Sequence, residues 1–147
     1  MASTYEISGT FRAIGDSATL SGGSFSGSFT LDDGFFPCTT ECSDYLYDAA
    51  YAIDIFNASG SKVTTLANTP GSESYLQIAT TCADIHGGLR LFFRNSRSSC
   101  LQLVMPLTFG GTGSIDFEGA NYALVQGNGY AHIEDASVKV VTAGCAD

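Results

Sequence analysis

The sequence predicts an all-β protein: an antiparallel, jelly-roll-like β-sandwich of about ten short strands with at most one short helix. Apolar and polar residues alternate with a period of two in one segment after another, as they do on half-buried strands. Turn-forming residues separate these segments at roughly 8–12 residues, a spacing typical of sandwiches and barrels. The chain has 17 Gly, 17 Ser and 14 Thr among its 147 residues, which favours many turns and excludes a long-helix protein.

Alternation is clearest in the first half of the chain. One face of the first strand carries Tyr5, Ile7 and Phe11, whereas the other face is polar. The second strand repeats this pattern, with Phe25 and Phe29 inward and serines outward. The next two strands flank a turn of small and polar residues and are expected to pair as a hairpin. The strands expected in this half cover residues 5–13, 24–31, 51–56 and 62–66.

The second half combines further strands with one candidate helix. Leu91, Phe92 and Phe93 make a segment that is apolar on both faces, which favours a central strand. The expected strands cover residues 75–80, 89–94, 100–105, 114–117, 122–126, 129–134 and 137–142. The helix is expected over residues 43–50, with Ser43 as its N-cap and Asp44 in its first turn.

The charge balance argues against polyanionic partners. The net charge is −9, whereas nucleic-acid binding depends on Lys and Arg that displace counterions. An anionic membrane surface is disfavoured for the same reason, and no apolar run approaches the roughly 18 residues of a membrane helix. The length favours one domain over residues 1–147. Because Met1-Ala2-Ser3 leads directly into a strand pattern, we expect a secreted or cell-surface chain whose signal peptide has been removed.

The cysteine count indicates an oxidising compartment. Five cysteines in a chain of this size predict two disulfides and one odd thiol. Zinc is disfavoured because no Cys-x-x-Cys pair occurs. Sequence alone leaves the connectivity open. Local bridges are expected, Cys38 with Cys42 and Cys82 with Cys100, which leaves Cys145 as a free or intermolecular thiol.

The least regular segment, residues 32–48, is where a ligand site is expected. Its carboxylates are the hard oxygen ligands that calcium prefers, although the spacing of an EF-hand loop is absent. Its tyrosines could stack on sugar rings while carboxylates accept hydroxyl protons. The candidate calcium ligands are Asp32, Asp33 and Glu41, and the candidate sugar-binding residues are Asp44, Tyr45, Tyr47 and Asp48. The plainer interpretation, turn and cap residues in a solvated loop, stays open.

Catalytic chemistry has little support in the sequence. Neither His86 nor His132 has neighbours that define a nucleophile pair, and Cys82 is expected in a disulfide. Late carboxylates such as Glu118 and Glu134 could act in glycoside hydrolysis, but sequence does not define their separation. We therefore expect no catalytic residues and no cofactor other than, at most, calcium.

Two stretches carry a family resemblance. Residues 5–11 and 20–32, where Ser, Gly and Phe alternate before an Asp turn, resemble the start of secreted bacterial proteins with a C-terminal PEP-CTERM sorting tail. A late Gly-rich turn at residues 110–116 is also similar. The resemblance implies export to the cell surface or matrix and carries over no catalytic residues. The sequence departs from the family in lacking the Pro-Glu-Pro signal with its membrane tail and in its higher cysteine content.

These observations predict a non-enzymatic extracellular adhesion, matrix or surface-assembly module. Its edge strands would pair with copies of itself or contact matrix components, and Cys145 could lock such contacts. The alternative is a lectin-like carbohydrate-binding module, with or without calcium. A small hydrolase on a jelly-roll scaffold, using Glu118 or Glu134, is the third hypothesis.

Overall fold

The computed structural model describes residues 3–31, 43–46, 50–68, 74–79, 89–95, 99–105 and 121–142. These residues form ten strands and no helix. The strands are β1 Ser3–Phe11, β2 Ser24–Leu31, β3 Ser43–Leu46, β4 Tyr51–Phe56, β5 Lys62–Ala67, β6 Tyr75–Ala79, β7 Leu89–Arg94, β8 Cys100–Met105, β9 Tyr122–Val125 and β10 Gly129–Thr142. A search of the same residues finds no helix long and apolar enough to cross a membrane.

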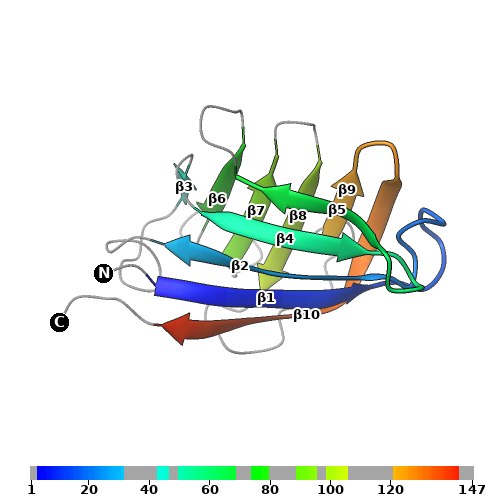
Figure 1. The fold of residues 1–147 in the computed structure, drawn as a ribbon. Helices are drawn as coiled ribbons and strands as arrows, with labels where there is room; N and C mark the ends of the chain where they lie inside the picture. The colour runs from blue at the N-terminus through cyan, green and yellow to red at the C-terminus, as the bar shows by residue number, and fades with distance from the viewer. Residues whose placement is uncertain are drawn as a thin grey trace.

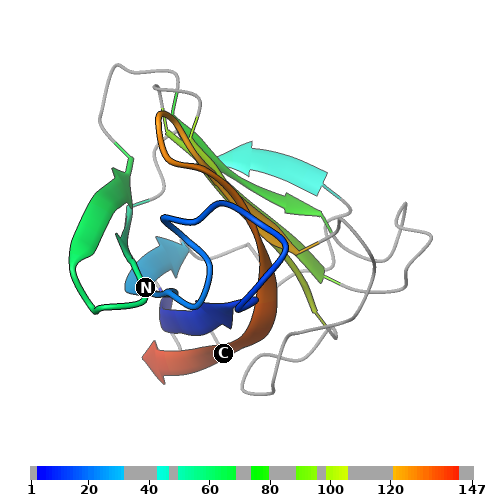
Figure 2. The same ribbon diagram turned by 90° about the vertical axis from the view of Figure 1, so that its right-hand side faces the viewer.

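All neighbouring strands pair antiparallel in one sheet, in the order β3-β6-β7-β8-β9-β10-β1-β2-β4-β5. β10 joins the two halves, because its first part pairs with β9 and the rest pairs with β1. Figure 1 shows β1, β2, β4 and β5 crossing in front of β6 to β9. Figure 2 shows β10 curving from one half to the other. The sheet therefore curls over on itself.

This continuous sheet differs from the expected sandwich of two separate sheets. The expectation of a break between strands 129–134 and 137–142 is wrong, because β10 runs unbroken through it. A register shift lies there instead: Thr10 pairs with Asp135 and Phe11 with Ile133, so one residue of β10 is extra. Such a bulge bends a strand and increases its twist, which lets one strand serve both halves.

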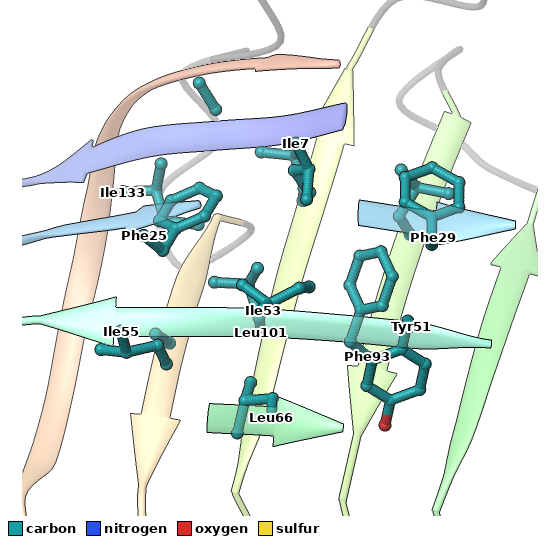
Figure 3. Close-up of a cluster of buried hydrophobic side chains, with 14 of the residues drawn as sticks. Ile7, Phe25, Phe29, Tyr51, Ile53, Ile55, Leu66, Phe93, Leu101 and Ile133 are labelled. Atoms are coloured by element: carbon teal, nitrogen blue, oxygen red, sulfur yellow. The ribbon is translucent and has the colours of Figure 1, made fainter. Parts of the chain in front are cut away.

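The core lies between the two halves of the curled sheet (Figure 3). Phe93 of β7 makes edge-to-face ring contacts with Phe29 of β2 and Tyr51 of β4, at centroid distances of 5.3 and 5.2 Å. The Tyr51 hydroxyl donates a hydrogen bond to the Arg94 carbonyl, so its polar end is satisfied. Gly9 is required beside this core, because a Cβ there would lie 2.5 Å from the ring of Phe25. Rings from both halves thus interlock across the fold.

Most strands follow the predicted bounds, and the helix does not. The strands expected over residues 24–31, 51–56, 89–94 and 100–105 are confirmed with these bounds, as is the β4–β5 hairpin. The helix expected over residues 43–50 is wrong, because Ser43–Leu46 is strand β3 and pairs with β6. A local N-cap signal is weaker than the backbone pairing that β3 gains with β6. The strand expected over residues 114–117 lies outside the described residues.

Candidate functional site

The outer side of the β6–β10 half carries a row of rings and amides. The inward residues of these strands are buried, among them Leu76, Leu91, Leu101, Ala123 and Ala131, so their neighbours along each strand face outward. Strand register places one outward residue of each strand side by side. Taken from β6 to β10, these outward residues are Gln77, Phe92, Gln102, Tyr122 and His132. In the strand register, the backbone position of Tyr45 on β3 is opposite Gln77. Glutamines and aromatic residues therefore alternate from Gln77 to Tyr122, and His132 adds a second ring next to Tyr122.

We call this surface the ring face. The adjacent row adds two tyrosine rings, a cation and an exposed apolar side chain to it. The ring face consists of the outward side chains of Tyr75, Gln77, Phe92, Arg94, Gln102, Tyr122, Leu124, Tyr130 and His132. All are half-buried except Leu124, which is 39% exposed.

Two groups of rings stand on either side of β8. On β6 and β7, Tyr75 and Phe92 lie 6.1 Å apart between centroids, and the Arg94 guanidinium lies 5.8 Å from the Tyr75 ring centre. On β9 and β10, Tyr122 and Tyr130 lie 5.4 Å apart in a tilted arrangement. Each group is held by ring–ring contacts, which limits the rotation of its members.

A buried carboxylate fixes the second group. Asp16, in the β1–β2 connection, has a side chain only 3% exposed. It accepts hydrogen bonds from the backbone N–H of His132 at 3.0 Å, from His132 Nδ1 at 2.9 Å and from Arg12 Nη2 at 2.9 Å. The other imidazole nitrogen, Nε2, lies 3.1 Å from the Tyr130 hydroxyl. With Nδ1–H donated to Asp16, Nε2 of a neutral imidazole accepts from that hydroxyl.

The electrostatics follow from this network. Burial alone raises the pKa of Asp16, but the hydrogen bonds from His132 and Arg12 and the charge of His132 outweigh it, so the pKa of Asp16 is lowered. Burial, followed by the negative charge of Asp16, raises the pKa of Tyr130, although Arg12 opposes the rise. Asp16 is thus a stable anion, and Tyr130 keeps its proton.

Asp16, His132 and Tyr130 place a carboxylate, an imidazole and a hydroxyl in series. The same order of groups occurs in activated nucleophiles. The pKa of the Tyr130 hydroxyl is raised, chiefly by burial, so this hydroxyl keeps its proton. The network orients the imidazole and the Tyr130 ring at the edge of the ring face. The hydroxyl proton is donated to Nε2, and the hydroxyl oxygen can still accept a hydrogen bond.

Most residues singled out from the sequence lie outside the described residues. This holds for Asp32, Asp33, Cys38, Glu41, Cys42, Tyr47, Asp48, Cys82 and Cys145. Asp44 and Tyr45 belong to β3, where Tyr45 stands opposite Gln77 in the ring row and Asp44 stands opposite Ile78. In the part of the chain that is described, no three potential metal ligands come together.

Cys100 differs from its expected role. It is a buried free thiol rather than half of a Cys82–Cys100 disulfide. It lies in the outward row between Arg94 and Leu124, on the same side of β8 as Gln102, and is only 7% exposed. Burial raises the pKa of the Cys100 thiol, and this effect exceeds the opposing hydrogen bonds from Tyr122 and Leu124 and the charge of Arg94.

The other half of the sheet has a different outer side, which we call the hydroxyl face. Register places small hydroxylated residues opposite one another on the outer side of β10, β1 and β2, with the charged residues Glu6, Asp135 and Lys139 among them. Two shallow depressions, of about 470 and 440 Å³, cross this face. The hydroxyl face consists of Thr4, Ser8, Thr10, Ser24, Ser26, Ser28, Thr30 and Ser137.

Sequence reasoning did not single out Gln77, Phe92, Gln102 or Tyr122 as site residues. Each one is an ordinary outward residue of its own strand, and the row exists only once the strands are paired. Comparison with known protein families finds no matching family model, and comparisons with curated proteins and with solved structures find no match.

Proposed function

We propose that this chain is a non-enzymatic module that binds carbohydrate on the ring face. The observation that carries the proposal is the row of outward rings and amides across adjacent paired strands. Aromatic rings offer flat apolar area to the C–H faces of sugars, and glutamine amides both donate and accept hydrogen bonds with sugar hydroxyls. The proposal keeps the carbohydrate alternative of the sequence and moves its site from the 32–48 loop to a sheet face.

The spacing of the rings suits a linear glycan. Phe92 and Tyr122 lie on β7 and β9, with Gln102 of β8 between them. Strands lie about 4.8 Å apart, so these two ring positions are separated by about 10 Å. That separation is comparable to the length of a disaccharide, so a chain crossing the strands would meet a ring, an amide and a second ring in turn.

The scaffold supports binding at low entropic cost. The ring positions are on paired strands, and ring–ring contacts together with Asp16 hold them. A site that is already ordered loses little conformational freedom when ligand binds. With a net charge of −9, the protein would repel acidic polysaccharides, so we infer that the ligand is a neutral glycan.

The remaining expectations extend this proposal. We infer that the two halves of the curled sheet act as the layers of a jelly-roll-like sandwich, and that the chain works outside the cell. Self-association through the two outermost strands of the sheet, β3 and β5, has less support. β3 is short, and the edge strand β5 carries exposed Lys62, a residue that disfavours edge pairing.

Affinity electrophoresis through gels containing soluble neutral polysaccharides tests the proposal. The panel should include β-1,4- and β-1,3-linked glucans, xylan, mannan and glycol chitin. We expect retardation by at least one of them, and its loss in the Phe92→Ala/Tyr122→Ala double variant. The Ser26→Ala/Ser28→Ala variant, on the hydroxyl face, should migrate like the native protein. Unretarded migration in every gel, or retardation that survives loss of both rings, would contradict the proposal.

A further inference from the structure

Among the residues that the structure describes, one edge of β10 is open along the part that pairs with β1. β9 pairs with β10 only up to His132. Within the described residues, no strand lies beside residues 134–142 on the side away from β1. An open edge of this length is a template for another strand.

Backbone directions identify the groups at that edge. Phe11 donates its N–H to Gly23 on the β2 side, whereas Arg12 donates to His132 on the β10 side. Because these directions alternate along a strand, the even-numbered residues of β1 bond to β10. Their partners on β10 are Asp135, Ser137 and Lys139. The intervening residues, Ala136 and Val138, therefore turn their N–H and C=O groups toward the open edge. Val140 follows Lys139 and continues this alternation, just before the register shift between Tyr5 and Thr4.

The side chains near this edge are unusually apolar for an exposed strand. Four large hydrophobic side chains are exposed among the described residues, and two of them are Val140 at 48% and Val141 at 56%. Both are β-branched residues, which favour strand pairing. This end of β10 lacks the proline that would block an approaching strand.

Opposite charges lie symmetrically on β10. Asp135 and Lys139 are each two residues from Ser137, on the same face of the strand. If an identical strand paired antiparallel with Ser137 opposite its own copy, each Lys139 would face Asp135 of the other copy. Such pairs would be of the non-hydrogen-bonded type, in which side chains approach most closely. Lys139 also stands opposite Glu6 of its own chain, so it would lie between two carboxylates.

We propose that two copies of this chain pair edge to edge through residues 136–140 of β10, about a twofold axis at Ser137. The partner is a second copy because the charge pattern is self-complementary about that residue. Pairing joins the two curled sheets into one continuous sheet. It also places two ring faces on one particle, which would strengthen binding to a polymer by multivalency. The pairing itself does not depend on carbohydrate binding.

Sedimentation velocity at graded protein concentrations, up to the millimolar range and in reducing buffer, tests this pairing. The reducing agent removes disulfide-linked dimers through cysteine. We expect the native chain to shift from monomer to dimer with concentration. Val140→Pro removes a backbone N–H at the open edge without removing one from the β1 ladder, so it should stay monomeric. Val140→Thr keeps that N–H and should dimerise.

A charge exchange tests the register without a proline. Lys139→Asp should weaken dimerisation at least tenfold, and Lys139→Asp/Asp135→Lys should restore it. A native chain that stays monomeric at the highest concentration would overturn the proposal. So would a folded Val140→Pro variant that still dimerises, or a double charge variant that remains as weak as the single one.

Discussion

The hydroxyl face and the ring face carry different side chains, although the strands of both halves bury apolar residues on their inner side. On the hydroxyl face, small side chains such as Ser8, Ser26 and Ser28 are exposed to water. On the ring face, larger side chains such as Phe92 and Tyr122 are half-buried among one another. Both halves contribute buried apolar residues to the same core. The inner side therefore stabilises both halves, and only the outer side distinguishes them.

This difference supports the proposal that ligand binds on the ring face. Small hydroxyl groups outside a sheet keep it hydrated and need no partner. Half-exposed rings gathered on one surface leave apolar area in water, which the fold does not require. The hydroxyl face shows that this sheet can be covered without rings. The ring face is therefore the proposed binding face, and variants of the hydroxyl face serve as controls for it.

The largest predicted effect is a loss of stability, and it should differ between an inward and an outward residue of strand β7. Phe93→Ala should lower the free energy of unfolding by about 3–5 kcal/mol, because Phe93 is fully buried and joins the two halves. Phe92→Ala, one residue earlier and outward, should lower it by about 1 kcal/mol or less. Urea unfolding of both variants checks this. Equal losses would mean that the ring face is part of the structural core.

The next effect concerns the carboxylate beneath the ring face. Asp16→Asn should lower stability by about 1–3 kcal/mol at neutral pH, since it weakens hydrogen bonds to a buried anion. The pKa of Asp16 is lowered in the folded state, so its contribution is present above the ordinary value of 3.8 and is lost as pH falls through the folded pKa.

Thermal unfolding from neutral to acid pH measures this contribution. The gap in Tm between native protein and Asp16→Asn should narrow as pH falls below 3.8. A gap that stays constant over that range would show that the charge of Asp16 is not what stabilises the network.

Removing two rings should weaken glycan binding by a free energy similar to the loss of stability expected for Asp16→Asn. Each ring that stacks on a sugar contributes about 1 kcal/mol, so Phe92→Ala/Tyr122→Ala should raise Kd by about 30-fold. Isothermal titration with the hexasaccharide of the retarding polysaccharide provides the measurement. A Kd within about twofold of the native value would place the ligand elsewhere.

The smallest effect is expected on the hydroxyl face. Ser26→Ala/Ser28→Ala should change the free energy of unfolding by about 0.5 kcal/mol or less and leave Kd unchanged, because both serines are exposed. Urea unfolding and the same titration check this. A marked loss of binding here would reverse the assignment of the two faces.

The sequence predicted strands well where the signal is local. Alternation around Phe25 and Phe29 or around Ile53 and Ile55 depends only on neighbouring residues, and these strands have the predicted bounds. The helix at Ser43 was wrong because a cap signal does not reveal that β6 lies alongside. The unbroken β10 was missed because a bulge and a turn look alike in sequence.

The site was less predictable because it depends on register. Tyr45 was singled out for its ring, and its strand position falls in the ring row. Phe92, Gln102 and Tyr122 become neighbours only when β7, β8 and β9 pair, and nothing in their own segments encodes that pairing. Asp16 looks like an ordinary turn residue, and its role depends on His132, 116 residues away.

Chemical-shift mapping of the ¹⁵N-labelled native protein tests the central claim most directly, with that same hexasaccharide as the probe. The account predicts shifts concentrated on the backbone amides of ring-face residues, in particular Phe92, Gln102 and Tyr122, and unchanged amides at Ser8, Ser26 and Ser28. Shifts centred on the hydroxyl face, or none at saturating oligosaccharide, would contradict it.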